Sequence, residues 1–253
     1  MSDEATASPK PEFQPLYAQI QALITRRIGD AAWKPGELLP TEYELAAEYG
    51  VSQGTVRKAL IALEGERLIV RRQGVGTYVA RHARDTVLFR FFRMVEPSGA
   101  RLTPRSRVLR QSIRPATVQQ ANQLGLEAGA KLHAVTRLRL LGDAPAIYEE
   151  IFAPVALVPS LPLPKDREME EEMYVIYQER HNILIARVEE KLRATAARVK
   201  EANVLAVPIG TPLLEIVRVA FDACGRPIEL RVSRCDTREY RYSTLITAAE
   251  EAR

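Results

Sequence analysis

Two helix start signals in close succession constrain the fold of the N-terminal part of the chain more than any other feature of the sequence. Thr41 and Glu44 have the spacing of a capping box, in which each side chain bonds the backbone N–H group of the other residue. Gly50 is suited to end that helix, and Ser52 is a favourable N-cap for a second one. The sequence therefore predicts two short helices joined by a tight turn at "YGVS".

The second helix, predicted for residues 53–65, contains a glycine in its first turn. A glycine inside a helix costs roughly 1 kcal/mol relative to alanine, so Gly54 weakens the helix that it belongs to. Val51 and Val56 are placed to pack across the helix start, which gives the helix a core-facing side. A glycine at this place indicates that another molecule approaches the helix backbone closely.

Two short helices with a glycine in the joint are typical of a helix-turn-helix, although a small helical core alone can mimic that spacing. The segments "LIVRR", "QGVG" and "TYVA" then predict a strand, a turn and a strand. Between Ser52 and Arg72 there are five Lys/Arg residues and two Asp/Glu residues, a net charge of +3. Positive charge is thus concentrated on the predicted reading surface, as phosphate contacts require.

The segment from residue 15 to residue 80 closely resembles the winged-helix domain of the GntR family of bacterial transcription regulators. The resemblance is carried by "LPTEYELA", "VSQGTVRKAL" and "RRQGVGTYVA". Many members have arginine where this chain has Tyr43 and Gln53, and a glutamine can read adenine where an arginine reads guanine. The resemblance and the predicted helix start together assign DNA contacts to Thr41, Ser52, Gln53, Gly54, Thr55, Arg57, Lys58, Arg72, Gln73, Gly74 and Gly76.

The C-terminal half alternates strand-like and helix-like segments and predicts an α+β domain with a largely antiparallel sheet. The acidic segment "REMEEEMYVIYQER", residues 167–180, predicts a helix with a solvated face. Strand alternation places Arg137 and Arg139 on one face of a strand. These arginines either line a pocket or face solvent, paired with Glu149 or Glu150 on a neighbouring strand.

Residues 91–247 resemble the UTRA ligand-binding domain of the HutC-type branch of the GntR family, through "FFRMV", "VTRLRLLGDAPAIYEEIFAP" and "LLEIVRVAFDACGRPIELRVSRCDTREYRY". The resemblance implies a chorismate-lyase-like fold, a homodimer and a small-molecule effector. Paired arginines suit an anionic group. Glu172 and Cys235 depart from the residues typical of members that sense sugar phosphates, so we expect a carboxylated or amphoteric metabolite. The expected effector-binding residues are Arg137, Arg139, Glu149, Tyr174, Glu229, Arg231 and Ser233.

The expected fold is a two-domain α+β chain in which a winged helix-turn-helix precedes an antiparallel sheet with flanking helices. We expect a disordered tail over residues 1–12, the DNA-binding domain over 13–80, a linker over 81–90, the UTRA-like domain over 91–247 and a tail over 248–253. The linker is the expected element that changes the spacing of two DNA-reading heads in a dimer.

The remaining features favour a cytoplasmic regulator over other classes of protein. Cys224 and Cys235 match no metal or redox spacing, and no apolar run is long enough to predict a membrane span. We expect no catalytic residue, no metal and no cofactor. The predicted function is a dimeric repressor that binds palindromic operator DNA, associates with the nucleoid when bound, and responds to a small metabolite.

Two other classes of protein stay open as alternatives. The first is an enzyme of chorismate-lyase-like fold with an accessory DNA-binding domain, although the sequence contains no nucleophile–base pair. The second is a sequence-independent DNA-packaging protein, which would need a stronger positive charge than the net +4 of this chain.

Overall fold

The computed structural model describes residues 14–81, 90–165 and 167–245 of the 253-residue chain. The chain divides between Ala80 and Arg81 into two compact units, which are described separately. The predicted tails, residues 1–12 and 248–253, lie outside the described residues, as does the predicted linker apart from Arg81 and Arg90.

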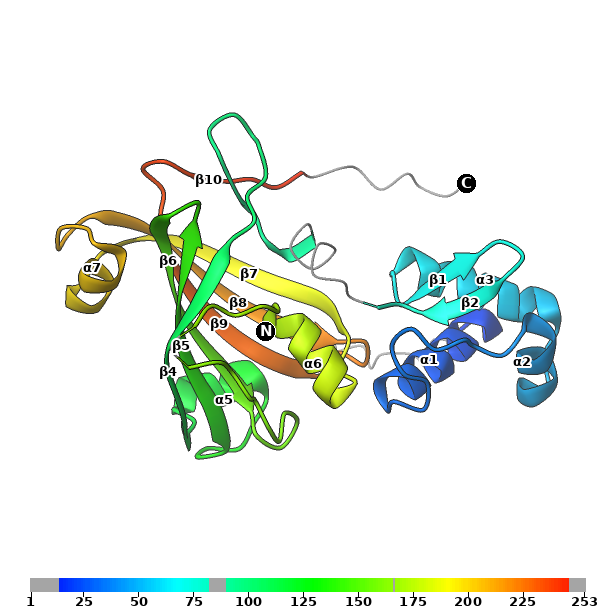
Figure 1. Cartoon of the computed structure of the whole chain (residues 1–253). Coiled ribbons are helices and arrows are strands. Elements are labelled where there is room, and N and C mark those ends of the chain that lie inside the picture. Colours follow the sequence, from blue (N-terminus) through cyan, green and yellow to red (C-terminus); the bar gives the residue numbers. More distant parts are fainter. Residues whose placement is uncertain (1–13, 82–89, 166, 246–253) are drawn as a thin grey trace, which may run out of the picture. The chain divides into compact units, whose positions relative to one another are not determined.

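The first unit contains three helices followed by a β-hairpin (Figure 1). Their bounds are α1 Leu16–Gly29, α2 Glu42–Tyr49, α3 Gln53–Gly65, β1 Ile69–Arg72 and β2 Gly76–Val79. Both predicted helix starts are confirmed. Thr41 and Glu44 form the capping box of α2, Gly50 ends that helix in the left-handed conformation, and the Ser52 side chain accepts a hydrogen bond from the backbone N–H of Thr55.

The core of the first unit explains why these elements pack together. Apolar residues at helical spacing on α1 and α3 are almost fully buried, and the hairpin closes the unit through Ile69 and Val79, which are register partners on β1 and β2. The Arg72–Gly76 pair is the last of this ladder, so residues 73–75 form the tip of the wing. The core residues of the two helices are Ile20, Ile24, Ile28, Val56, Ala59, Leu60 and Leu63.

The second unit is built on a six-stranded antiparallel sheet with the strand order β4-β5-β6-β9-β8-β7. The predicted α+β class with an antiparallel sheet is confirmed. The strands are β4 Arg105–Pro115, β5 Lys131–Leu141, β6 Ala144–Pro154, β7 Ile185–Ala196, β8 Pro212–Asp222 and β9 Pro227–Asp236. Two short strands, β3 Met94–Val95 and β10 Arg241–Tyr242, pair separately.

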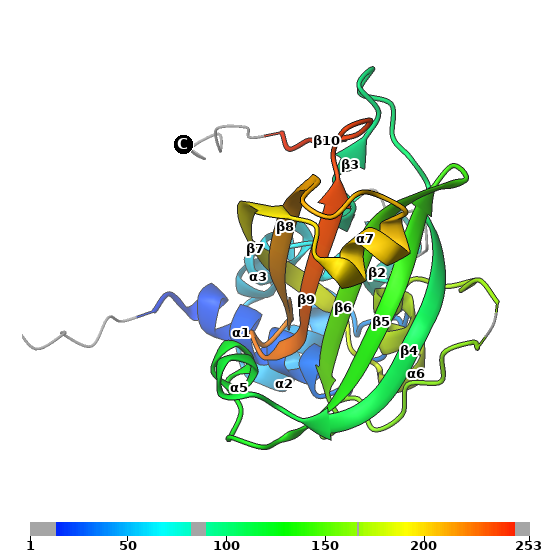
Figure 2. The ribbon, with the colours of Figure 1, turned by 90° about the vertical axis from the view of Figure 1, so that its left-hand side faces the viewer.

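Helices cover both faces of this sheet (Figures 1 and 2). α6, Met173–His181, packs on one face in a cluster with Val135 and Ile151. α5, Val118–Leu124, and α7, Val199–Leu205, pack on the opposite face. Because strand side chains alternate between faces, the odd-numbered residues of β5 near Arg137 point toward α6.

The predicted helix over residues 167–180 is wrong in its first part. α6 begins only at Met173, because Glu168 forms a bridge with Arg107 of β4 and the backbone N–H of Met169 donates to the carbonyl of Ser106. The end of the acidic run is also not solvated, since Glu172 is 6% exposed. Pairing with a distant strand therefore overrides the local helical pattern.

Candidate DNA-binding surface and ligand site

The first turn of α3 presents polar residues to solvent on the side opposite the core. Ser52, Gln53 and Gly54 are exposed and Thr55 is half-buried, whereas Val56 is fully buried. The turn leaves backbone N–H groups at the helix start, which suit anionic groups such as phosphates. The structure thus brings together the predicted contact residues of this helix, including Arg57 and Lys58, which are both exposed.

Arg57 is held by a residue that the sequence did not single out. Its guanidinium Nη2 lies 2.8 Å from a carboxylate oxygen of Glu42, in the first turn of α2. The other oxygen of Glu42 lies 3.5 Å from Arg71 of the wing strand β1. A single carboxylate therefore orients one arginine of the reading helix and one of the wing. The three residues are far apart in sequence, so no local pattern predicts their contact.

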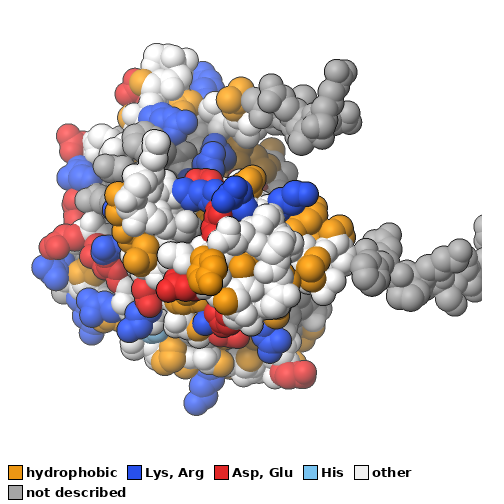
Figure 3. All heavy atoms as spheres, turned by 90° about the vertical axis from the view of Figure 1, so that its right-hand side faces the viewer, with side chains coloured by type: hydrophobic (Ala, Val, Ile, Leu, Met, Phe, Trp, Pro, Cys, Tyr) orange, Lys and Arg blue, Asp and Glu red, His pale blue; other side chains and the backbone are white. Residues whose placement is uncertain are grey.

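The basic side chains of this surface are interspersed with acidic ones (Figure 3). The pairing of Arg57 with Glu42 is one instance, and that of Arg71 with Glu64, at 3.7 Å, is another.

The glycines of the predicted DNA surface differ in what the fold requires of them. In the wing, Gly74 has φ +71° and Gly76 has φ +140°, and a Cβ atom at Gly76 would lie 2.6 Å from a methyl carbon of Leu38. These two positions need glycine for the turn itself. At Gly54 a Cβ atom would meet only the Ser52 hydroxyl, at 3.8 Å, which is ordinary contact. The fold therefore gives no reason for glycine at position 54.

The hydroxyl groups of Thr41 and Ser52 stabilise helix starts in the free protein. Thr41 Oγ1 accepts from the backbone N–H of Glu44 at 3.2 Å, and Ser52 Oγ accepts from that of Thr55 at 3.2 Å. In the wing, the guanidinium of Arg72 lies 4.9 Å from the centre of the Tyr78 ring, and Gln73 is exposed. These residues stay available at the surface, but their side chains already have a structural role.

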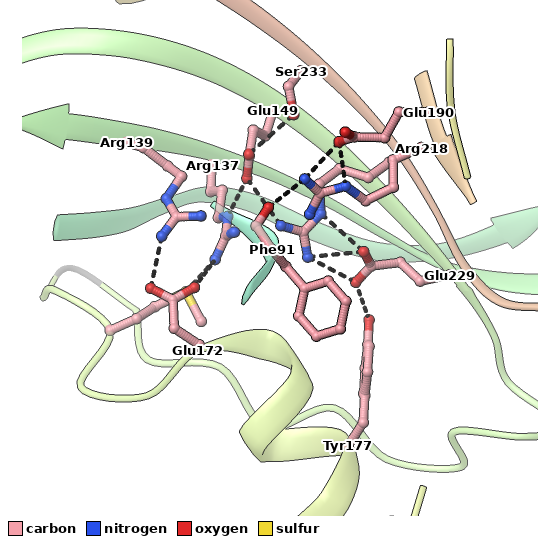
Figure 4. A network of polar contacts seen from close by, with 12 residues as sticks. Phe91, Arg137, Arg139, Glu149, Glu172, Tyr177, Glu190, Arg218, Glu229 and Ser233 are labelled. Atoms are coloured by element: carbon pink, nitrogen blue, oxygen red, sulfur yellow. Dashed lines mark hydrogen bonds and ion pairs between the residues drawn. The ribbon is translucent and has the colours of Figure 1, made fainter. Parts of the chain in front are cut away.

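The second unit contains a buried cluster of arginine and glutamate side chains between the sheet and α6 (Figure 4). Arg137 Nε donates to Glu149 at 2.6 Å, and Ser233 Oγ donates to the other oxygen of Glu149 at 3.0 Å. Arg231 forms an ion pair with Glu229 at 2.8 Å. All five residues are buried, the most exposed being Ser233 at 7%.

Strand register explains why these residues meet. Arg137 is the register partner of Glu149 between β5 and β6, and Glu149 is the partner of Ser233 between β6 and β9. All three point to the face that α6 covers, so the alternative that these charges face solvent is wrong. Glu150 points to the opposite face, where it accepts from Arg234 at 2.9 Å.

The cluster includes ionic residues that were not among the predicted site. Glu172, which precedes α6, accepts from Arg139 at 2.7 Å. Arg218 of β8 pairs with Glu190 of β7 at 2.6 Å and donates to the carbonyl of Phe91 at 2.5 Å. The single arginine of "LLEIVRVAFD" and the acidic run were visible in the sequence, but only the fold brings them to one place.

Aromatic side chains cover the cluster. The ring of Phe91 packs edge-on against that of Tyr174 with centroids 5.2 Å apart, and the Phe92 ring lies 4.8 Å from the guanidinium of Arg139. Tyr177 donates its hydroxyl to Glu229 at 2.7 Å. The predicted site residue Tyr174 is therefore part of a packed cover, and Phe91 and Phe92 belong to the segment that follows the predicted linker.

Burial and the neighbouring charges together shift the pKa values of the acid–base groups in the cluster. Burial opposes ionisation of Glu149, but Arg137, Arg231 and Arg139 together hold the pKa of its carboxyl well below the usual range. Burial lowers the pKa of Arg139 to about 10, against the opposing effect of Glu172. Burial and the neighbouring Glu229 raise the pKa of Tyr177 well above its ordinary value. At neutral pH Arg139 and Glu149 are therefore charged, and Tyr177 is a neutral donor.

The cluster contains little empty space. Two cavities with volumes of about 10 and 20 Å³ lie beside it, and Phe92, Arg139, Arg218 and Arg231 line both. Each is close to the space that one water molecule needs, and far below the ~300 Å³ of ordinary ligand pockets. Arg139, which lines both cavities, has its Nε buried without a hydrogen-bond partner within the described residues, and so has Arg137 Nη2 elsewhere in the cluster. Any metabolite that binds here must move the residues that cover the cluster.

Within the described residues, no group of three or more His, Cys, Asp or Glu side chains is placed to hold a metal ion. None of the helices in that part of the chain is long and apolar enough to cross a membrane.

Comparison with known proteins gives matches to both units. Residues 16–79 match the family model described as bacterial regulatory proteins, gntR family, and residues 99–241 match that of the UTRA domain. The chain is 31% identical to the HTH-type transcriptional repressor NagR of Bacillus subtilis, over 85% of this chain and 88% of NagR. It is 30% identical to MngR, the mannosyl-D-glycerate transport/metabolism system repressor of Escherichia coli, over 95% of this chain and 99% of MngR.

Solved structures support the same fold. A ligand-binding domain assigned to a GntR-family transcriptional regulator of Bordetella bronchiseptica superposes with a TM-score of 0.58 at 25% identity, covering 62% of this chain and 98% of that domain. PhnF of Mycobacterium smegmatis gives a TM-score of 0.54 at 22% identity over 90% of this chain and 99% of PhnF, which bears on the fold alone.

Proposed function

The chain belongs to the GntR family of bacterial regulatory proteins and carries a UTRA domain, and from this premise we propose that it is a repressor with two separate binding sites. Operator DNA binds the first turn of α3 and the wing, and a small metabolite binds the buried arginine–glutamate cluster. One observation carries the proposal: Arg139 Nε, a guanidinium donor without a hydrogen-bond partner within the described residues, lies buried beside two cavities in the second unit. Such donors are costly unless a ligand or water uses them.

We propose that Gln53 and Arg57 contact base edges and that Ser52 and Thr55 contact phosphates, because these four residues lie at the exposed start of α3. The N-terminal end of a recognition helix is the part that enters the major groove. Gly74 and Gly76 allow the tight wing tip to approach the minor groove. A homodimer would read a palindrome with half-sites about one helical turn, ~34–36 Å, apart. Such a regulator acts in the cytoplasm, on the nucleoid.

A ligand changes operator affinity only if it binds the DNA-competent and incompetent states with different affinities. We propose that the cover of the cluster provides this difference. Arg218 bonds the carbonyl of Phe91, and Phe92 lies over Arg139, so a ligand that reaches Arg139 must move this segment. The segment follows directly on the predicted linker, residues 81–90, and movement there would change the spacing of two reading heads.

A mobility-shift experiment with DNA from upstream of the gene tests the proposed function. At physiological salt, we expect a shifted band that survives excess scrambled DNA, because specific binding exceeds non-specific binding by roughly 10³-fold or more. Equal competition by scrambled DNA would favour a packaging protein. No shift at all would leave the enzyme alternative, which the repressor names of NagR and MngR already disfavour.

A further inference from the structure

Glu172 fills the place in the cluster that an acidic group of a ligand would need. We propose that the effector is therefore an uncharged molecule rich in hydroxyl groups, such as an unphosphorylated sugar or polyol. The inference rests on the proposed function, since it takes the buried cluster to be the effector site. It replaces the anionic ligand that the paired arginines alone led us to expect.

The first argument is the charge balance of the cluster. Four buried or nearly buried arginines each lie within 2.8 Å of a glutamate oxygen, in the pairs Arg137–Glu149, Arg139–Glu172, Arg218–Glu190 and Arg231–Glu229. Each of these four positive charges is already matched by a negative one. An anionic ligand would add an unmatched charge to a buried site, and such a charge is strongly unfavourable. A neutral ligand adds none.

The second argument is the position of Glu172. It is the N-cap residue of α6, yet its side chain makes no capping hydrogen bond. Instead, one oxygen accepts from Arg139 at 2.7 Å and the other lies 4.0 Å from Arg137 (Figure 4). This carboxylate belongs to the same chain, so its effective concentration beside the arginines exceeds that of any dissolved anion. A free phosphate or carboxylate competes poorly with it.

The cluster contains both donors and acceptors of hydrogen bonds. Arg137 Nη2 and Arg139 Nε are donors that lack acceptors within the described residues. The carboxylates of Glu149 and Glu229 lie on the same face of the sheet and accept hydrogen bonds. A hydroxyl group both donates and accepts, so several hydroxyls on one small molecule can satisfy both kinds of group.

A thermal-melting experiment on the full-length chain tests the proposal. The probes are inorganic phosphate and a panel of neutral sugars and polyols, each with its phosphate ester. We expect at least one neutral compound to raise the melting temperature of the wild type. We expect its phosphate ester and inorganic phosphate to leave the melting temperature unchanged.

Glu172→Ser removes the carboxylate and should open the anion position. We expect inorganic phosphate at about 10 mM to raise the melting temperature of this variant by roughly 2–4 °C, since a ligand of the folded state stabilises by mass action. Glu171→Ser is the matched control, because Glu171 is the exposed neighbour, and it should behave as the wild type. Glu172→Gln keeps the side-chain volume and serves if the serine variant does not fold.

Three results would overturn the proposal. The first is a wild type that responds to phosphate or prefers a phosphate ester. The second is a wild type that responds to no neutral member of the panel. The third is a Glu172 variant, serine or glutamine, that gains no response to phosphate. Operator binding is measured separately by mobility shift, so a protein that binds its operator but fails these tests refutes the ligand class and leaves the DNA-binding function standing.

Discussion

Replacing Gly54 by alanine should change stability and DNA binding in opposite directions. Gly54 lies in the first turn of α3, and an added Cβ atom would meet only the Ser52 hydroxyl at 3.8 Å. The free protein therefore has room for the methyl group. If glycine is present because DNA approaches the backbone at this point, the same methyl group will obstruct the complex.

The size of each effect follows from the helix and from the interface. Alanine is more favourable than glycine in a helix by roughly 0.5–1 kcal/mol. For a domain of the size of the first unit, 1 kcal/mol corresponds to about 4–8 °C, so we expect its melting temperature to rise by roughly 2–8 °C. A displaced DNA backbone loses several short contacts at once, and we expect operator affinity to fall at least about tenfold, or ~1.4 kcal/mol.

Gly65→Ala is the matched control for this experiment. Gly65 is the last residue of the same helix, and an added Cβ atom there meets nothing within 4 Å. Melting curves and mobility-shift titrations of both variants measure the two effects. We expect both variants to be at least as stable as the wild type, and only Gly54→Ala to lose operator affinity. Equal operator affinity of the two variants would refute the close approach of DNA to position 54.

Three further predictions concern stability. Glu149→Gln leaves buried Arg137 without its carboxylate and should destabilise the second unit by roughly 3–5 kcal/mol. Glu150→Gln should cost at most about 1 kcal/mol, because its partner Arg234 is partly exposed. Equal losses of unfolding free energy in urea would argue against the cluster. Because the pKa of Glu149 is lowered in the folded protein, its carboxylate stabilises the fold above the ordinary pKa of 4.5, and this stabilisation is lost in stronger acid. The melting temperature of the wild type should therefore fall more steeply below pH 4.5 than that of Glu149→Gln. Gly76→Ala should destabilise the wing by roughly 1–3 kcal/mol, because alanine would have to adopt φ +140°, a conformation that L side chains rarely adopt, and an unchanged melting temperature would contradict this geometry.

Local signals in the sequence were sufficient to predict α2, α3 and the hairpin of the first unit. The capping box of Thr41, the N-cap at Ser52 and the glycine-containing wing turn each act within a few residues, so the pattern alone fixes where the elements begin and end. The contact of Glu42 with Arg57 and Arg71 was not predicted, because it joins three elements that are separate in the sequence.

The second unit was predictable only in part, for a related reason. Strand alternation places Arg137 and Arg139 on one face, but alternation does not reveal which face a helix covers. The start of α6 was predicted too early because a bridge from Glu168 to Arg107 depends on a strand far away in the sequence. The burial of Glu172 follows from the same non-local packing, and it changes the chemistry expected of the ligand.

The central claim is that this chain recognises its operator through the exposed start of α3, and the specificity ratio of an Arg57→Ala variant tests it most directly. The Arg57 side chain is 60% exposed, so its removal leaves the fold intact, and Arg26→Ala removes a charge that is 80% exposed from α1 as a control. Dissociation constants for upstream and scrambled DNA are measured at physiological salt. We predict that Arg57→Ala lowers the ratio at least about tenfold while Arg26→Ala preserves it. An unchanged ratio in the Arg57 variant would contradict the account.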